Sequence, residues 1–393
     1  MNSFLDILIV DYRLEGFNRY AIGICSELHK LNPNLRIGAC YMQKKPAKYI
    51  EGFVEVFCAQ DYSLNAKAIL EQYKPRAILT FAHRFFDYMF TVEAHRLGLI
   101  VFNFQHGLYM NNTVISELSA KSFYNVLLKK YEKLNIYLRC SFNMNQRRIL
   151  PTIQFLGSFI RKKSLYRVVN EAFGKACNAD VSYIYGEYWK RYYEEQYHEK
   201  ATRFVVVGYP ELEGPKKRIN NEVFDNPSLD VICYLAQTSV EDGLLPLNNM
   251  QSFIEEMEKC LTQFNLVIKF HPRSDHNIYR SLLSERHRGS VLVWNDNMFP
   301  DADMYIGHES TVVARAMETT AKTMIIRLNP NRESPFEKYA CFTKTSFDGL
   351  SDALCKMALK NDVKIDPKFQ EFVWFNHSGA LRQTAQDMDS ELS

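Results

Sequence analysis

The chain has 393 residues, of which 47% are hydrophobic and 24% are charged, and its formal net charge is +3. A chain of this length is longer than a domain with one hydrophobic core usually is, which favours two domains. The composition excludes a mainly disordered chain. A net charge this small does not indicate a nucleic-acid-binding protein, and we expect no nucleic acid among its partners.

The first part of the chain alternates between apolar runs and amphipathic segments. The runs predict strands at Leu5–Val10, Arg36–Met42, Val54–Ala59, Arg76–Phe81, Leu99–Phe104 and Arg203–Pro210. The segments between them predict helices at Gly16–Leu31, Leu64–Tyr73 and Phe85–Leu97. Because strands separated by helices of this length form crossover units, the pattern predicts a parallel α/β sheet.

A basic segment interrupts this lobe between Lys121 and Asn170. It holds eleven basic residues and one acid, Glu132, with aromatic and aliphatic residues between the charges. The basic residues are Lys121, Lys129, Lys130, Lys133, Arg139, Arg147, Arg148, Arg161, Lys162, Lys163 and Arg167. Two interpretations stay open: a surface for an anionic membrane or a polyanionic acceptor, and a solvated helical face. RNA binding is a less favoured third, because no recognised RNA-binding module accompanies the charges.

Residues 211–229 are rich in Pro, Gly, Asn and charge without periodicity, which predicts an interdomain linker. The alternation then resumes, with strands expected at Asp230–Ala236, Asn265–Phe270, Val291–Trp294, Asp303–Ile306 and Thr323–Leu328, and helices at Gln251–Gln263 and Thr311–Thr320. We therefore expect a first lobe at 1–210, with the basic insertion at about 121–167, and a second lobe at 230–393. We also consider an arrangement in which the last helix packs back on the first lobe.

The start of the chain, Met1–Val10, has no basic region, and its apolar run stops at Asp11, so we expect no signal peptide. No stretch reaches the roughly 18–20 apolar residues that a membrane span needs. The nine cysteines include no C-x-x-C pair, which favours reduced thiols over zinc or disulfides. We expect a cytoplasmic protein, with Lys121–Arg167 as a means of peripheral attachment to the inner membrane.

Four polar clusters follow predicted strands, and open α/β sheets bind ligands beyond the carboxyl ends of their strands. The first cluster is Gln105-His106-Gly107. A glycine turn there suits an imidazole that points out of the sheet and acts as a general base or binds a phosphate. The alternative is a histidine that only caps the turn.

The second cluster is Glu241-Asp242-Gly243, after the strand Asp230–Ala236. One of two adjacent carboxylates can face an acceptor hydroxyl and remove its proton, while the other faces solvent. An ordinary loop is equally consistent with these residues.

The third cluster ends another predicted strand and contains Lys269, His271, Pro272 and Arg273. Pro272 fixes the backbone after His271. The three basic side chains suit the negative charge that grows on a phosphate leaving group. A purely structural His-Pro turn is the alternative.

The fourth cluster runs from Gly307 through Glu309 to Ser310 and Thr311, where a helix is expected to begin. Hydroxyls and N–H groups at a helix start can cap the helix and also bind a phosphate. Glu309 is placed to reach a ribose or sugar hydroxyl.

Other chemistries lack their motifs. No G-x-G-x-x-G follows the first strand and there is no P-loop lysine, which argues against NAD enzymes and nucleoside triphosphatases. Ser310 is not in a G-x-S-x-G elbow. Asp301-Ala302-Asp303 precedes a strand, so we expect a loop there and neither a metal nor a cofactor. The aromatic-rich stretch Tyr183–Tyr197 favours packing over contact with a glycan.

The acidic cluster at Asp242, the His271-Pro272 pair and Ser310-Thr311 together resemble motifs of bacterial surface-polysaccharide glycosyltransferases of the GT-B type. They are most similar to bacterial sialyltransferases and related enzymes that use CMP-activated nonulosonic or octulosonic acids. The resemblance implies an α/β fold with two Rossmann-like lobes and a cleft between them. It also implies an inverting enzyme without an essential metal.

The same resemblance implies roles for individual residues. Asp242 or Glu241 would be the general base, His271 would act on the departing CMP phosphate, and Ser310 and Thr311 would hold that phosphate. The donor would be a CMP-linked sialic acid or Kdo-like sugar. The acceptor would be a bacterial surface glycan of capsule, lipooligosaccharide or O-antigen.

The His106-Gly107 pair departs from that pattern. Together with the Lys-x-His-Pro sequence it is more similar to capsule transferases and teichoic-acid glycerophosphotransferases. That resemblance implies His106 as the base and CDP-glycerol or CDP-ribitol as the donor. Two further alternatives are a nucleotide-sugar 2-epimerase on the same fold and a non-catalytic partner of a polysaccharide assembly complex.

Overall fold

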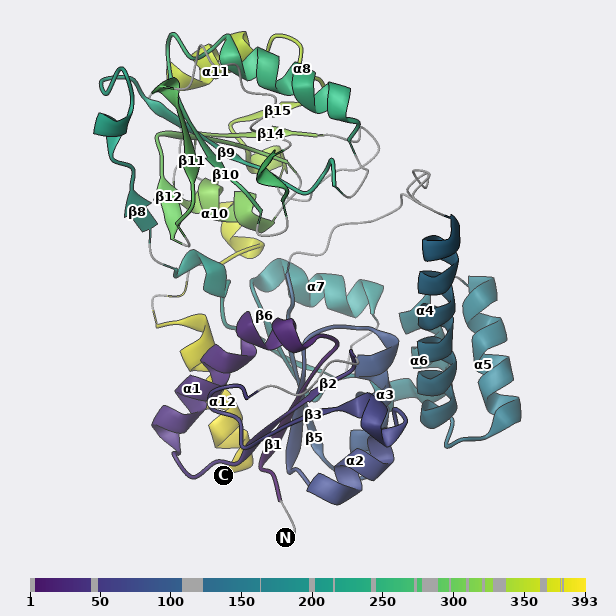
Figure 1. The fold of residues 1–393 in the computed structure, drawn as a ribbon. Helices are drawn as coiled ribbons and strands as arrows, with labels where there is room; N and C mark the ends of the chain where they lie inside the picture. The colour runs from purple at the N-terminus through teal and green to yellow at the C-terminus, as the bar shows by residue number, and fades with distance from the viewer. Residues whose placement is uncertain are drawn as a thin grey trace. The chain divides into compact units, whose positions relative to one another are not determined.

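The computed structural model describes residues 4–43, 49–107, 123–162, 164–197, 202–214, 216–241, 245–271, 274–277, 289–296, 298–308, 311–319, 322–327, 337–360, 366–374, 376 and 378–393 (Figure 1). For Glu15, residues 123–133 and Thr311 it describes the backbone only. The chain forms two compact units. Unit 1 holds the described parts of Met1–His106, Ser122–Pro210 and Glu371–Ser393, and unit 2 holds Gly107 and the described part of Glu211–Gln370.

Unit 1 is built on seven parallel strands in the order β3-β2-β1-β4-β5-β6-β7. The strands are β1 (Ile7–Asp11), β2 (Ile37–Tyr41), β3 (Glu55–Cys58), β4 (Ala77–Thr80), β5 (Ile100–Phe104), β6 (Val181–Ile184) and β7 (Arg203–Val206). The helices are α1 (Ala21–Leu31), α2 (Ala66–Tyr73), α3 (Phe85–Arg96), α4 (Phe123–Met144), α5 (Ile149–Lys162), α6 (Leu165–Phe173), α7 (Glu187–Gln196) and α12 (Ala380–Leu392), with 3-10 turns η1 (Leu14–Asn18), η2 (Ala59–Tyr62) and η3 (Gly174–Cys177). The parallel α/β sheet predicted from the alternation is confirmed.

The central strands of this sheet are buried along their whole length. Every residue of β1, β2 and β4 is buried, which explains why the sequence shows continuous apolar runs there rather than alternation. In register, Asp11 at the end of β1 lies opposite Tyr41 of β2, and Ile9 lies opposite Leu79 of β4. The carboxyl ends of these strands therefore share one edge of the sheet.

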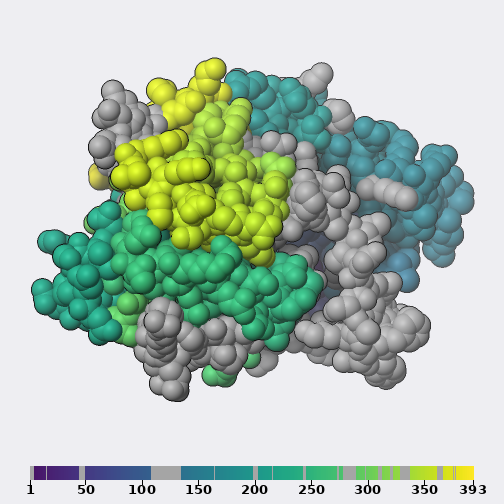
Figure 2. Space-filling view, turned by 90° about the horizontal axis from the view of Figure 1, so that it is seen from above, coloured from purple at the N-terminus to yellow at the C-terminus, as the bar shows by residue number. Residues whose placement is uncertain are grey.

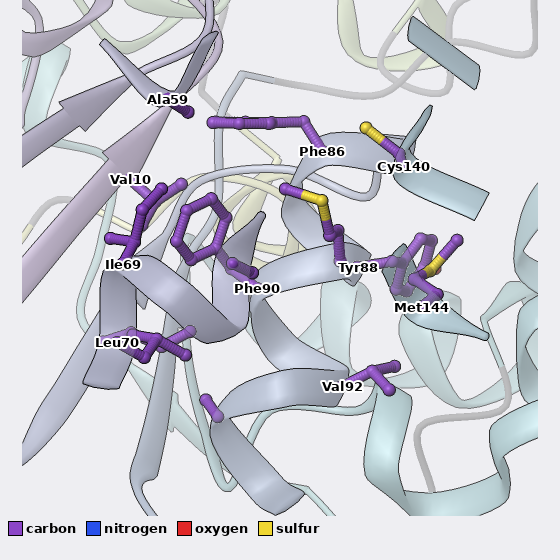
Figure 3. Packing of buried hydrophobic residues seen from close by; sticks show 14 of the residues in the cluster. Val10, Ala59, Ile69, Leu70, Phe86, Tyr88, Phe90, Val92, Cys140 and Met144 are labelled. Carbon is purple, nitrogen blue, oxygen red and sulfur yellow. The ribbon is translucent and has the colours of Figure 1, made fainter. Parts of the chain in front are cut away.

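Helix α3 is buried on nearly all sides, although it includes the acidic residues Asp87 and Glu93. Its residues from Phe85 to Ala94 are all buried. Figure 3 shows Phe90 beside Val10 of β1 and Ile69 of α2, and Tyr88 beside Met144 of α4. The sheet with α2 covers one side of α3, and the basic segment supplies the cover on another.

The basic segment folds into α4, α5 and α6, which lie side by side on this flank of unit 1 (Figure 1). Their contact with α3 is largely aromatic. The Phe85 ring stacks on Tyr137 of α4 at 4.3 Å between centroids and meets Phe159 of α5 edge-on at 5.1 Å. One face of the basic segment is thus part of the core.

The end of the chain returns to unit 1. Helix α12 packs on α1, and its Asp387 accepts hydrogen bonds from Tyr183 of β6 at 2.9 Å and from Arg203 of β7 at 2.8 Å. The indole Nε1 of Trp189, which is fully buried, donates to the carbonyl of Phe372 at 2.6 Å. The last residues therefore complete the side of the sheet that β6 and β7 form.

Unit 2 is built on six parallel strands in the order β11-β10-β9-β13-β14-β15. These are β9 (Val231–Leu235), β10 (Asn265–Lys269), β11 (Val291–Trp294), β13 (Met304–Gly307), β14 (Thr323–Ile326) and β15 (Phe342–Lys344). The other elements are α8 (Leu247–Glu258), α10 (Thr311–Thr319), α11 (Leu350–Ala358), η4 (Pro210–Leu212), η5 (Asn221–Val223), η7 (Glu337–Tyr339), η8 (Pro367–Glu371) and the parallel pair β8 (Lys216–Arg218) and β12 (Phe299–Asp301). Figure 2 shows α8 and α11 next to each other on the surface of this unit.

Some elements differ from the sequence-based expectation. Residues 211–229, predicted to be without regular structure, contain β8, which pairs with β12. The aromatic-rich stretch at Tyr183–Tyr197 contains the end of the unpredicted strand β6 and then α7. Asp301, predicted to lie in a loop, ends β12 instead, and Asp303 anchors the start of β9, because its Oδ2 accepts a hydrogen bond from the Val231 N–H at 2.8 Å. Within the ranges given above, no helix has both the length and the apolar character required to cross a bilayer.

Candidate functional site

The strand orders locate the ligand-binding edges. Both sheets run 3-2-1-4-5-6 by chain order, and unit 1 adds a seventh strand. In such sheets the crevice lies at the carboxyl ends of the two strands where the order reverses. These strands are β1 and β4 in unit 1, and β9 and β13 in unit 2.

In unit 2 the structure brings two of the predicted clusters together. Glu241, in the loop after β9, accepts a hydrogen bond through Oε1 from the backbone N–H of Asp275 at 2.8 Å. Asp275 follows a tight turn in which the Ser274 N–H donates to the His271 carbonyl at 2.8 Å. The acidic loop and the His271 turn are therefore neighbours, and His271 stays partly exposed. Asp242, Pro272 and Arg273 lie outside the described residues.

Lys269 has a structural role in the described structure. Its ammonium donates to the carbonyls of Asp296 at 3.2 Å and Met298 at 3.4 Å, which ties the end of β10 to the segment after β11. Burial lowers the pKa of Lys269, and the nearby Arg315 acts in the same direction. Its predicted contact with a phosphate stays a prediction.

The end of β13 packs tightly against α10. A Cβ on Gly307 would lie 2.4 Å from Cγ2 of Val313, so the close approach of strand and helix requires glycine at this position. Thr311 begins α10, as the sequence predicts for the helix start, while Glu309 and Ser310 lie outside the described residues. The start of a nine-residue helix therefore stands directly after the switch-point strand.

His308 belongs to the core of unit 2. It is 2% exposed, and its Nδ1 lies 2.9 Å from the carbonyl of Ile326 while Nε2 lies 2.9 Å from the hydroxyl of Tyr234. A carbonyl only accepts, so Nδ1 carries the proton and Nε2 accepts from the tyrosine. Burial lowers the pKa of His308 to about 4. The neutral ring bridges three strands and holds the edge of the sheet together.

In unit 1 the cluster after β5 divides into a structural and an accessible residue. Gln105 is fully buried and fixes the turn, because its Oε1 accepts from the Tyr185 N–H at 3.0 Å and its carbonyl accepts from the Tyr185 hydroxyl at 2.6 Å. Gly107 has φ of +78°, a conformation that favours glycine. His106 lies between them, partly exposed, with its ring edge-on to Tyr20 at 6.1 Å between centroids.

A polar cluster at the switch point of unit 1 was not predicted from the sequence. Asp11 ends β1 and is 4% exposed, and its Oδ1 accepts from Arg84 at 3.2 Å. Arg84 also donates to both oxygens of Asp87, at 2.7 and 3.1 Å. Burial raises the pKa of Asp11, against the opposing effect of Arg84. The signal in the sequence that could have indicated this cluster is Asp11, a carboxylate directly after a wholly apolar run.

A cavity of about 520 Å³ lies in unit 2, beyond the carboxyl ends of β14 and β15. Ile326, Arg327 and Phe347 line it, together with Asn249, Ser252 and Glu255 of α8. Arg327 also forms an ion pair with the buried Glu337. Among the described residues, no three His, Cys, Asp or Glu side chains are grouped so as to hold a metal ion.

Two Rossmann-type sheets with these strand orders define an α/β protein of the GT-B fold class. No protein-family model matches the sequence, and no curated protein matches it.

Solved structures share the fold over nearly the whole chain. The wall teichoic acid polymerase TagF has 11% identity and a TM-score of 0.51, over 100% of this chain and 90% of that one. The UDP-GlcNAc 2-epimerase from Methanocaldococcus jannaschii has 12% identity and a TM-score of 0.53, over 98% and 99%. UGT71G1 of Medicago truncatula, complexed with UDP-glucose, has 9% identity and a TM-score of 0.53, over 100% and 99%. At these identities the likeness shows the fold.

Proposed function

We propose that this protein is a glycosyltransferase that moves a sugar from a nucleotide-activated donor to a bacterial surface glycan. The observation that carries the proposal is a partly exposed histidine just beyond the carboxyl end of one strand in each unit. His106 follows β5, which pairs with β4, and His271 follows β10, which pairs with β9. Ligands of open α/β sheets bind at this edge. Proteins of the same fold take nucleotide-linked substrates, as the UDP-glucose complex of the plant enzyme illustrates.

The proposed chemistry is direct displacement at the anomeric carbon with inversion. A base in the set Asp242, Glu241 and His106 removes the proton of the acceptor hydroxyl as that oxygen attacks. The bond between the sugar and the donor phosphate breaks, and the negative charge of the leaving nucleotide grows. His271 and the N–H groups at the start of α10 are proposed to stabilise that charge.

Of the three base candidates, Glu241 and His106 are among the described residues. Glu241 already accepts a backbone hydrogen bond at 2.8 Å, which gives it a part in holding the loop. His106 is partly exposed beyond β5, and imidazole is the side chain most often used as a general base. We therefore propose Asp242 or His106 as the base and Glu241 as a positioning residue.

For the donor we propose a CMP-linked sialic acid or Kdo-like sugar, used without a metal, and for the acceptor a glycan of capsule, lipooligosaccharide or O-antigen. Arg273, Glu309 and Ser310 are proposed to complete the donor site. This choice rests on the order of the acidic, His-Pro and Ser-Thr motifs along the chain.

A polyol-phosphate transferase with CDP-glycerol or CDP-ribitol is the second candidate. The similarity to TagF, whose structure was determined with CDPG, favours it, as does the His106-Gly107 turn. A 2-epimerase is the third, since enzymes of that kind share the fold. An epimerase acts on its nucleotide sugar without an acceptor, which separates it from both transferases.

A thermal-shift screen of the full chain against CMP, CDP, UDP, GDP and ADP tests the proposal. A nucleotide at a hundred times its Kd stabilises the native state by roughly 2.7 kcal/mol and raises the Tm. We expect the largest shift with CMP. A shift with CDP alone supports the polyol-phosphate candidate, and a shift with UDP or GDP refutes our donor. No shift with any nucleotide contradicts the enzyme and favours a non-catalytic partner of an assembly complex.

A further inference from the structure

One helix of the basic segment is apolar on both of its faces. The inner face of α5 packs on α3 and α6 through Phe155 and Phe159. The outer face carries four aliphatic side chains that are largely exposed: Ile149 (71%), Leu150 (65%), Ile153 (61%) and Ile160 (74%). Leu150, Ile153 and Ile160 recur at helical spacing, so they form one stripe along the helix.

Exposed single aliphatic residues are common, but a stripe of them on one helix is not. Leu134 and Leu138 of the neighbouring α4 are also exposed, by 53% and 44%. Isoleucines at outward positions of a 14-residue helix expose apolar surface to water and so lower the solubility of the protein. Such a stripe is expected where an apolar environment covers it.

Positive charge flanks the stripe at both ends. Arg147 and Arg148 precede α5, and Arg161 and Lys162 end it. No acidic residue occurs between positions 133 and 170. The nearest acid after this stretch, Glu171, is paired with Lys162. The outer face therefore combines exposed aliphatic side chains along the helix with cationic residues at its two ends.

We propose that the outer face of α5 docks on an anionic lipid bilayer. A helix lying in the interface places aliphatic side chains at the boundary with the acyl chains and cationic heads among the lipid phosphates. Anionic leaflets attract each nearby Lys or Arg. A protein partner would favour aromatic anchors on this surface, but the phenylalanines of α5 point inward instead.

This inference stands apart from the proposed transferase activity. It rests only on the exposure and charge of α5 and holds equally if the protein is an epimerase or has no activity. In combination with the proposed activity, it places the enzyme at the surface where a lipid-linked glycan acceptor would be found.

Flotation of the purified full chain with vesicles tests the proposal. We expect the protein to float with vesicles of phosphatidylglycerol and phosphatidylcholine, and about tenfold less with phosphatidylcholine alone or in 0.5 M salt. The double variant Ile153→Asp/Ile160→Asp removes the stripe and should lower flotation by about tenfold or more. Arg148→Glu/Arg161→Glu should abolish the preference for the anionic vesicles.

Leu359→Asp is the matched control, because Leu359 is 79% exposed and lies in unit 2. It should float like the unmodified chain. Unchanged Tm values and nucleotide shifts show that the variants remain folded and separate this test from that of the transferase proposal. The inference is overturned if the unmodified chain does not float, or if Ile153→Asp/Ile160→Asp floats as well as Leu359→Asp. It is also overturned if the stripe variant instead dissolves a dimer seen by analytical ultracentrifugation, which would make α5 a contact between copies.

Discussion

His308 provides a sharp test of how the edge of the unit 2 sheet is held together. The structure buries this imidazole as the neutral tautomer, with Nδ1 donating to the Ile326 carbonyl and Nε2 accepting from Tyr234. We consider the substitution His308→Gln, which keeps one donor and one acceptor but cannot be protonated. The comparison with Tyr234→Phe keeps the histidine and removes only its hydroxyl partner.

The magnitude follows from proton linkage. His308 has a pKa of about 4 in the folded chain, below its ordinary value of 6.5. The unfolded chain therefore binds a proton at this residue below pH 6.5, while the folded chain does not. The resulting stability is complete above pH 6.5 and is lost as the pH falls toward 4. Between pH 7.5 and pH 5 the loss from this residue amounts to roughly 2 kcal/mol.

Urea unfolding at several pH values measures the effect. Other groups titrate over the same range, so the informative quantity is the difference in unfolding free energy between the unmodified chain and each variant. The stability advantage of the unmodified chain over His308→Gln should shrink by roughly 2 kcal/mol from pH 7.5 to pH 5. The difference from Tyr234→Phe should change far less, because that variant keeps the buried histidine.

Two results would refute this reasoning. A pH-independent difference from His308→Gln would mean that the folded chain takes up a proton at His308 as readily as the unfolded chain. A Tyr234→Phe variant with the pH profile of His308→Gln would mean that the tyrosine, rather than burial, keeps the ring neutral.

Three further predictions concern the strand ends. Arg84→Met leaves the buried carboxylate of Asp11 without its cation and should lower the unfolding free energy at pH 7 by roughly 2 kcal/mol, a value discounted for the partial exposure of Arg84. The loss should be smaller at pH 4, because a protonated Asp11 no longer needs the cation, and an equal loss at pH 4 would contradict this. Gly307→Ala should lower the Tm because its Cβ meets Val313, with a destabilisation of about 1–3 kcal/mol, and adding Val313→Ala should restore part of it; no rescue would place the strain elsewhere. His271→Ala should lower the turnover of the nucleotide donor by about a hundredfold or more at unchanged Tm, and loss of the fold would instead support a structural His-Pro turn.

The sequence predicts those parts of the fold that depend on local patterns. The strands β1, β9 and β10 are apolar runs, as expected for a parallel sheet that is covered on both faces. Their predicted bounds agree with those in the structure to within two residues. His106 and His271 follow the predicted strands β5 and β10, so their places beyond the sheets could be predicted from the sequence, while their roles stay predictions. Helix α3 was predicted although its buried residues surround the helix and leave little periodicity in the sequence.

What the sequence does not predict depends on distant pairing. The contact between Asp11 and Arg84 joins residues 73 positions apart, and neither residue has a local motif. Strand β6 is short and lies next to tyrosines that suit both a strand and a helix. Strand β8 is made of basic residues and is defined only by its pairing with β12. His308 was placed in a ligand-binding cluster by its neighbours in sequence, while its burial is set by Tyr234 and Ile326.

The return of Glu371–Ser393 to unit 1 has a consequence for how the protein is made. A ribosome adding about 5–20 residues per second reaches Ser393 roughly 10–40 s after it has passed Pro210. During that interval the nascent chain lacks the partner of the buried Trp189 and the helix that covers α1, while the contiguous stretch of unit 2 emerges whole. Unit 1 therefore receives its last segment only after the Glu211–Gln370 stretch of unit 2 has been made, and a chain interrupted before Glu371 lacks the residue that accepts the hydrogen bond of Trp189.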